Sequence, residues 1–224
     1  MSRLFSASGL SSKRYRVRVS AAEVFYNCCI ASGGFRTVLL QTLGMSAGQI
    51  GLVSSLCSAA NIIAPPVWGT VADRIRSYSK CFICCLFISA LLMILIPAAA
   101  TAGTAAITLI TVLLAVDSMF SGPANNMSEL WLVQINNSGM GISYGSLRLW
   151  ASIGYAVMGI VYTRLLAGHS VYIAYKLYGV FAVPALLLAL SLCNVPLSAE
   201  LFQAGEVLLQ PAVPDTIGKI DAMS

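Results

Sequence analysis

Charged residues are scarce in this sequence. Only 9% of its 224 residues are Asp, Glu, Lys or Arg, whereas 58% are hydrophobic. Soluble domains carry about 25% charged residues, so the composition excludes an ordinary soluble protein. The hydrophobic runs also lack the alternation of polar and apolar residues that marks a membrane barrel. The sequence therefore predicts an all-α membrane protein.

Histidine is nearly absent, since His169 is the only one. The seven cysteines all fall in apolar segments, where cysteine behaves as a small hydrophobic residue, so we expect no disulfide framework. Without further histidines, the cysteine-rich stretch 81–85 does not predict a metal site. A serine–histidine protease is excluded because His169 lies in a predicted loop. Paired-aspartate catalysis is excluded because Asp117 is the only aspartate deep in a predicted span. We expect no enzyme, no metal and no cofactor.

Long charge-free runs are what the sequence has instead, and about 20 apolar residues cross a bilayer as a helix. They predict six helices, at about residues 21–43, 47–72, 80–99, 104–133, 144–166 and 171–196. Prolines 65 and 66 should bend the second helix. Residues 1–20 form a basic tail, 21–197 the six-helix transmembrane bundle, and 198–224 a polar tail. Small residues let membrane helices approach closely, and we expect such contacts at Ser32–Gly34, Gly44, Gly48 and Gly51.

Basic residues are concentrated on one side of the predicted bundle. The first tail and the segment between the second and third helices contain Arg3, Lys13, Arg14, Arg16, Arg18, Arg74, Arg76 and Lys80. The loops of the other side have only Arg164 and Lys176, at helix ends. By the positive-inside rule, both termini are cytoplasmic in a multi-pass protein of the cell membrane. The net charge of +5 is thus a topology signal, and no nucleic-acid partner is expected.

The segment between the second and third helices contains the first motif, GTVADR at Gly69–Arg74. It resembles the signature loop of the major facilitator superfamily. The resemblance implies a cytoplasmic latch, built from Gly69, Asp73 and Arg74, that breaks and re-forms during transport. The sequence departs from the pattern where Arg76 replaces the second glycine and 77–78 replaces a basic pair. The alternative is an ordinary cytoplasmic loop that obeys the charge rule.

The second motif is YGSLRLWASIGY, residues 144–155. Arg148, Ser152 and Tyr155 are spaced i, i+4 and i+7, so they share one helix face. A guanidinium presents a planar fork of donors suited to paired hydroxyls, and the ring offers an apolar platform. An arginine inside a span is costly unless it faces protein, water or substrate. We therefore predict a substrate-binding face. The alternative is that Arg148 reaches the headgroups and Tyr155 is an ordinary packed residue.

This stretch resembles the fifth helix of the facilitator branch that contains the lactose permease and the oligosaccharide and nucleoside proton symporters. The resemblance implies that Arg148 binds sugar hydroxyls, that Tyr155 stacks on the sugar ring, and that Ser152 is the small residue between them. It also implies that an acid of the fourth helix, Glu129, pairs with Arg148. The implied function is secondary active transport, with proton-coupled uptake of a sugar, oligosaccharide or nucleoside.

Asp117 lies deep in the fourth predicted helix and matches no position of the family pattern. A buried carboxylate must be protonated or find a cation, and Arg36 of the first helix is the other deep charge. The first and fourth helices are counterparts in the inverted repeats of the facilitator fold. We expect Arg36 and Asp117 to form a structural or gating pair.

The resemblance covers one half of a facilitator, with six transmembrane helices in two inverted three-helix repeats. Residues 198–224 would then begin the central loop. Three explanations are open: a fragment, which we favour, a half that pairs with a second six-helix chain, or a homodimer. The alternative function is a non-transporting truncated six-helix membrane protein, or an interaction partner of a full-length permease.

Overall fold

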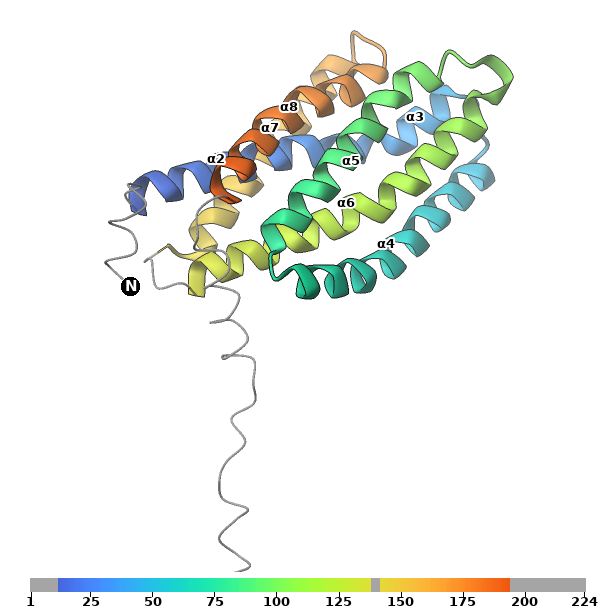
Figure 1. Ribbon diagram of the computed structural model, residues 1–224. Coiled ribbons are helices and arrows are strands. Elements are labelled where there is room, and N and C mark those ends of the chain that lie inside the picture. Colours follow the sequence, from blue (N-terminus) through green and yellow to red (C-terminus); the bar gives the residue numbers. More distant parts are fainter. Residues whose placement is uncertain (1–11, 138–141, 194–224) are drawn as a thin grey trace, which may run out of the picture.

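The computed structural model describes residues 12–137 and 142–193, and this part of the chain is helical throughout, with no strand. Long helices run side by side along the bundle (Figure 1). In chain order they are α2 (Ser12–Ile30), η1 (Ala31–Phe35), α3 (Arg36–Thr42), α4 (Ala47–Ile75), α5 (Tyr78–Ala99), η2 (Gly103–Ala105), α6 (Ala106–Asn137), α7 (Tyr144–Leu166) and α8 (Tyr172–Cys193). The predicted tail 198–224 lies outside the described residues.

Five of these helices, α4 to α8, are long and apolar enough to cross a membrane. Together with the helical fold and the composition, they confirm an all-α membrane protein. The first predicted span is divided among α2, η1 and α3. Because no single one of these pieces meets the length and hydropathy of a span, the count of six remains a prediction.

The first predicted helix differs most from expectation. It begins at Ser12 instead of near residue 21, and it tightens into a 3₁₀ turn at Ala31–Phe35. Glycine lowers helix stability, and the turn contains two, while the Ser32 hydroxyl bonds back to the Cys29 carbonyl. The expectation of close helix contacts was wrong here: a Cβ at any of glycines 33, 34, 44, 48 and 51 would meet no described atom within 4 Å. Gly33 and Gly34 lie in the 3₁₀ turn, Gly44 has a φ of +76° between α3 and α4, and Gly48 and Gly51 lie within the first turns of α4.

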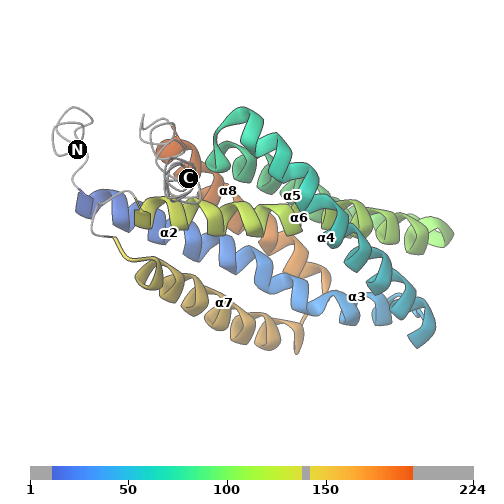
Figure 2. The ribbon, with the colours of Figure 1, turned by 90° about the horizontal axis from the view of Figure 1, so that it is seen from below.

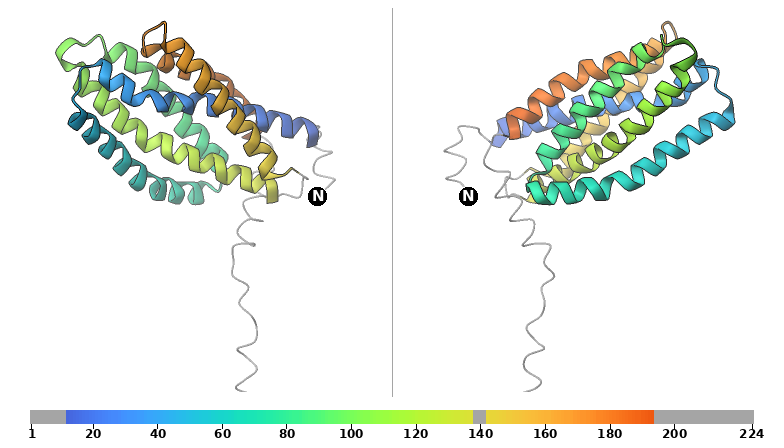
Figure 3. Two further views of the ribbon diagram at one scale, coloured as in Figure 1. Left: turned by 180° about the vertical axis from the view of Figure 1, so that it is seen from behind. Right: turned by 45° about the vertical axis from the view of Figure 1, so that its right-hand side comes forward.

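The other helices follow the predicted runs closely. Helix α4 continues through Pro65 and Pro66, and Figure 3 shows it as a curved helix. A proline inside a helix removes a backbone hydrogen bond, which accounts for bending. Helix α6 passes Pro123 without a break and extends to Asn137, a turn beyond the expected end.

The helices form two groups of three in chain order: the first begins with α2 and continues with α4 and α5, and the second is α6, α7 and α8. Most of the packing is between the two groups. Helix α2 packs against α7 and α8, α6 packs against α4 and α5, and α5 packs against α8. Figure 2 shows α7 alongside α2, and α4 alongside α6. The leading helix of each three-helix group thus contacts the other two helices of the opposite group. Two inverted three-helix repeats produce this pattern.

One end of the bundle gathers most of the basic residues. The starts of α2, α5 and α7 lie there with the ends of α4, α6 and α8 (Figure 1). Basic residues on these segments are Lys13, Arg14, Arg16, Arg18, Arg74, Arg76 and Lys80. The charge asymmetry of the sequence is therefore an asymmetry in space, and the assignment of this end to the cytoplasm remains a prediction.

Candidate functional site

An ion pair joins α6 to α7 near the basic end of the bundle. The Arg148 Nη2 lies 2.9 Å from Glu129 Oε1. It is the only ion pair within 4 Å in the described ranges 12–137 and 142–193. The Arg148 side chain is 41% exposed and the Glu129 side chain 37% exposed, so a ligand can still reach both. The guanidinium is thus turned towards α6, and the pairing implied by the sequence resemblance is present.

Ser152 and Tyr155 lie beside Arg148 on the surface of α7. At 100° per residue, Ser152 is about 40° and Tyr155 about 20° around the helix from Arg148. Both side chains are exposed, Tyr155 to 47%. The face next to the ion pair therefore offers a planar donor, a carboxylate acceptor, a hydroxyl and an aromatic ring.

Glu23 of α2 belongs to the same polar cluster and was missed in the sequence. Its side chain is 1% exposed. The Ser128 hydroxyl donates to Glu23 Oε1, and Asn27 Nδ2 donates to the Glu23 carbonyl at 2.9 Å. Because Ser128 precedes Glu129, these bonds connect α2 to the ion pair. The available signal was the spacing of Glu23 and Asn27, four residues apart on one face of an apolar segment.

The cluster contains more acid than base. Arg148 and Glu129 both act electrostatically on Glu23, yet Arg148 pairs directly with Glu129 alone. A buried carboxylate is stable only as the neutral acid or with compensating charge and hydrogen bonds. A buried acid such as Glu23, which has no ion-pair partner among the described residues, can hold an exchangeable proton.

Arg36 and Asp117 line a small cavity of about 70 Å³, together with Tyr175 and Tyr178. Asp117 is 1% exposed and accepts a hydrogen bond from Ser89. The Ser89 hydroxyl also lies 2.9 Å from the Tyr178 hydroxyl. Arg36, at the start of α3, makes no ion pair within 4 Å with Asp117. Both residues line one cavity, and the predicted pair remains a prediction.

The segment Gly69–Arg74 forms the last turns of α4. Asp73 and Arg74 are exposed and make no ion pair with any residue in the described ranges. A Cβ at Gly69 would meet no described atom within 4 Å, so this glycine is not needed for packing inside the bundle. Helix α4 ends where Arg76 adopts the left-handed conformation, with φ 53° and ψ 40°. Glycine is the usual residue in that conformation, which explains why the family pattern has glycine there.

Comparison with known proteins identifies the family of this chain. The profile of the MFS_1 like family matches residues 24–210. The chain belongs to the major facilitator superfamily. It is 29% identical over 157 residues to the maltose permease of Geobacillus stearothermophilus, an alignment that covers 69% of this chain and 38% of the permease. No solved structure matches the chain significantly.

Membership of this superfamily groups the chain with membrane transport proteins and not with enzymes. The aligned region spans well under half the length of the maltose permease. The match includes the helices that carry Glu129, Arg148 and Tyr155, because residues 24–210 contain all three.

Proposed function

We propose that this chain forms the N-terminal six-helix half of a cell-membrane permease for proton-coupled uptake of a sugar, oligosaccharide or nucleoside. The observation that supports it most is the ion pair of Arg148 and Glu129 beside the exposed Ser152 and Tyr155. The similarity to a maltose permease favours a sugar. Both termini would be cytoplasmic, and the other half would come from the same polypeptide, a second chain or a second copy.

The ion pair suits a ligand with neighbouring hydroxyl groups. The guanidinium donates through a planar fork, whereas the carboxylate accepts, so a hydroxyl can bond to both at once. The ring of Tyr155 covers the apolar face of a sugar or base, and Ser152 leaves room between them. Arginine is always charged, so recognition does not depend on its own protonation.

We assign the transported proton to Glu23, which is buried next to the Arg148–Glu129 pair and forms no ion pair with any described residue. Substrate that engages Arg148 and Glu129 changes the charge balance around Glu23, and this couples proton binding to substrate binding. Arg36 with Asp117 would act as an internal gate, and Gly69, Asp73 and Arg74 as the cytoplasmic latch. A double-mutant cycle of Arg36→Gln and Asp117→Asn, read as unfolding free energy, tests the gate; strict additivity counts against coupling.

Substrate protection of a cysteine at Ser152 tests the binding face. The variant Ser152→Cys is alkylated with a maleimide in membranes, with and without maltose, other glycosides and nucleosides. We expect at least one of them to slow alkylation several-fold. Ser146→Cys is the matched control, because it lies about 200° from Arg148 on the same helix and should show no protection. If no glycoside or nucleoside protects position 152, the substrate class is wrong.

Glu23→Gln tests the proton assignment. The amide keeps the shape of the side chain but holds no exchangeable charge, so it mimics the protonated acid. We expect wild-type substrate binding to weaken as pH rises, because Glu23 loses its proton, and the Glu23→Gln variant to bind equally well across that range. Binding of a labelled substrate against pH is the measurement. A variant with the wild-type pH profile contradicts the assignment but leaves the binding face intact.

Uptake into vesicles separates the transporter from its alternative. The chain is reconstituted alone and together with the remaining helices of a related permease. Uptake in either preparation supports the proposed function. Co-purification with a complete permease, without uptake in any preparation, supports the alternative of a non-transporting interaction partner.

A further inference from the structure

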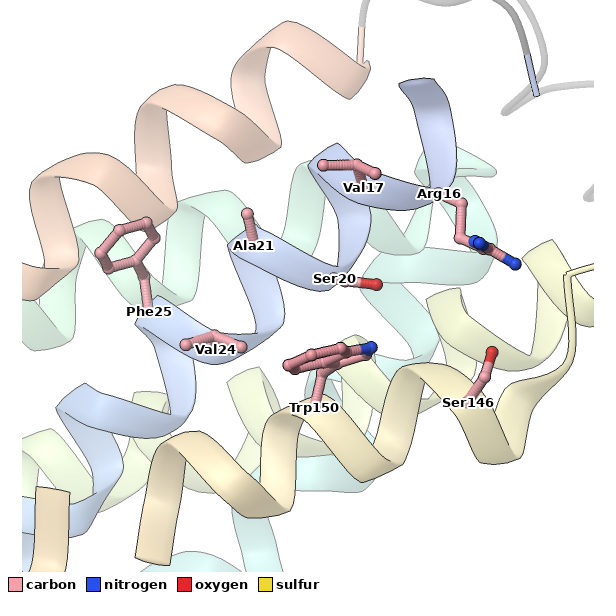
Figure 4. A pocket seen from close by; sticks show the side chains of 8 residues that line it. All are labelled: Arg16, Val17, Ser20, Ala21, Val24, Phe25, Ser146 and Trp150. Carbon is pink, nitrogen blue, oxygen red and sulfur yellow. The ribbon is translucent and has the colours of Figure 1, made fainter. Parts of the chain in front are cut away.

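A larger cavity lies apart from the ion pair, between the starts of α2 and α7. It is a groove of about 600 Å³, and Figure 4 shows its lining. Helix α2 contributes Arg16, Ser20, Val24 and Phe25, and α7 contributes Ser146 and Trp150. Neither the sequence motifs nor the family comparison gives this groove a role.

The groove opens on a different side of α7 from the substrate face. Trp150 is two residues from Arg148, which places it about 200° around the helix. Ser146 lies one turn before Trp150 and shares its face. A ligand in the groove therefore does not touch the ion pair, and this site is independent of the proposed function.

The lining changes from polar to apolar along the groove. Figure 4 shows Arg16 and Ser146 at one end, Trp150 and Ser20 between, and Phe25 at the far end. Arg16 is exposed and makes no ion pair with any residue in the described part of the chain. The polar end belongs to the end of the bundle that gathers the basic residues, where Lys13, Arg14 and Arg18 also lie on α2.

We propose that this groove binds one anionic phospholipid. The phosphate would lie against the Arg16 guanidinium, since arginine is well suited to charge-assisted bonds to phosphate oxygens. The hydroxyl of Ser20 would donate to the same headgroup, whereas the Ser146 hydroxyl already donates to the Ser143 carbonyl. Ser146 is in the first turn of α7, where the positive end of the helix dipole also favours an anion.

The rest of the lipid matches the rest of the groove. Tryptophan is typical of the interface between headgroups and acyl chains, and Trp150 occupies that level here. One acyl chain would run along Val24 and Phe25. Free phosphate would use only the polar end, and a sugar would leave the apolar end empty. Basic residues clustered at a membrane surface attract anionic lipids in preference to neutral ones.

Quenching of Trp150 fluorescence by brominated lipid tests the proposal. The full chain is placed in phosphatidylcholine vesicles with a minor fraction of brominated phosphatidylglycerol or, for comparison, brominated phosphatidylcholine. The Trp150→Phe variant isolates the signal of Trp150 from the other tryptophans. We expect phosphatidylglycerol to quench Trp150 several-fold more strongly at equal mole fraction.

Two charge variants decide whether the groove is responsible. Arg16→Gln should abolish the preference for phosphatidylglycerol, whereas Arg18→Gln, a basic neighbour outside the groove, should retain it. Native mass spectrometry of the purified chain gives a second readout: one phosphatidylglycerol stays bound to wild type and to Arg18→Gln and is lost from Arg16→Gln.

Three results would overturn the proposal. Equal quenching by both lipids means that Trp150 simply lies at the interface. Equal loss of preference in both charge variants means a diffuse basic surface without a site. Absence of quenching by either lipid means that protein covers the groove, either a second copy or another part of the permease.

Discussion

Gly154 is a point of close backbone contact between α7 and α2. A Cβ at this position would lie 2.9 Å from the Val24 carbonyl oxygen and 3.2 Å from the Val24 Cα. These are backbone atoms, so neither helix can relieve the contact by moving a side chain. The contact holds α7 against the helix that carries Glu23, and it therefore helps to position Arg148 in the cluster.

Substitution of Gly154 by alanine should destabilise the protein. Forcing a methyl group into a packed contact costs about 1–3 kcal/mol, and unfolding in mixed detergent micelles measures the loss. Gly159→Ala is the matched control on the same helix, because its Cβ meets no described atom within 4 Å. That variant should be neutral or up to about 1 kcal/mol more stable. Equal effects of the two substitutions would contradict the account of this contact.

At the residue scale, what could be predicted depended on local spacing. The i, i+4 and i+7 spacing of Arg148, Ser152 and Tyr155 is enough to place them on one helix face. The partner of Arg148 needed the family resemblance, since Glu129 is on another helix. The role of Glu23 depends on a hydrogen bond from Ser128, which no local pattern indicates. Arg36 and Asp117 line one cavity without an ion pair between them, and whether two side chains on different helices meet depends on packing that the sequence does not show.

A single residue, Arg76, marks the end of helix α4. Helix α4 stops at Ile75, and Arg76 takes a φ of 53°. A side chain with a Cβ is strained in the left-handed region by about 1–2 kcal/mol, whereas glycine is not. The departure from the family pattern at Arg76 therefore has a cost in stability at the turn into α5.

Arg76→Gly should accordingly stabilise the protein by about 1 kcal/mol. Arg74→Gly, two residues earlier and inside the helix, should destabilise it by about the same amount, because glycine is a poor helix former. Thermal unfolding in detergent compares the two. If both glycine variants are destabilised alike, the left-handed conformation of Arg76 does not limit stability.

Among the elements, α4 to α8 were predictable because each coincides with a long apolar run. The early start of α2 was not, since Lys13, Arg14, Arg16 and Arg18 make its first turns resemble a solvated tail. Charged residues do not prevent a helix such as α2 from extending beyond the membrane. The 3₁₀ turn at Ala31–Phe35 was also missed, although paired glycines are a known weak point of helices.

In the whole molecule, the helices of the first three-helix group pack mainly against those of the second, and this arrangement defines the fold. The pairs α2 with α7 and α8, and α6 with α4 and α5, place the leading helices of both groups at the polar clusters. Glu23 is on α2, whereas Glu129 and Asp117 are on α6. The repeat thus places the two buried acids, Glu23 and Asp117, on two equivalent helices.

We propose that α7 turns Arg148, Ser152 and Tyr155 towards a water-lined pathway. The most direct test is the reaction rate of single cysteines with a membrane-impermeant, charged thiol reagent, in membranes of cells that make the protein. Cysteine at Ser152 should react at least ten-fold faster than cysteine at Ser146, which faces the groove. Slow reaction at Ser152, equal to that at Ser146, would show that the guanidinium face is turned to lipid and would contradict the account.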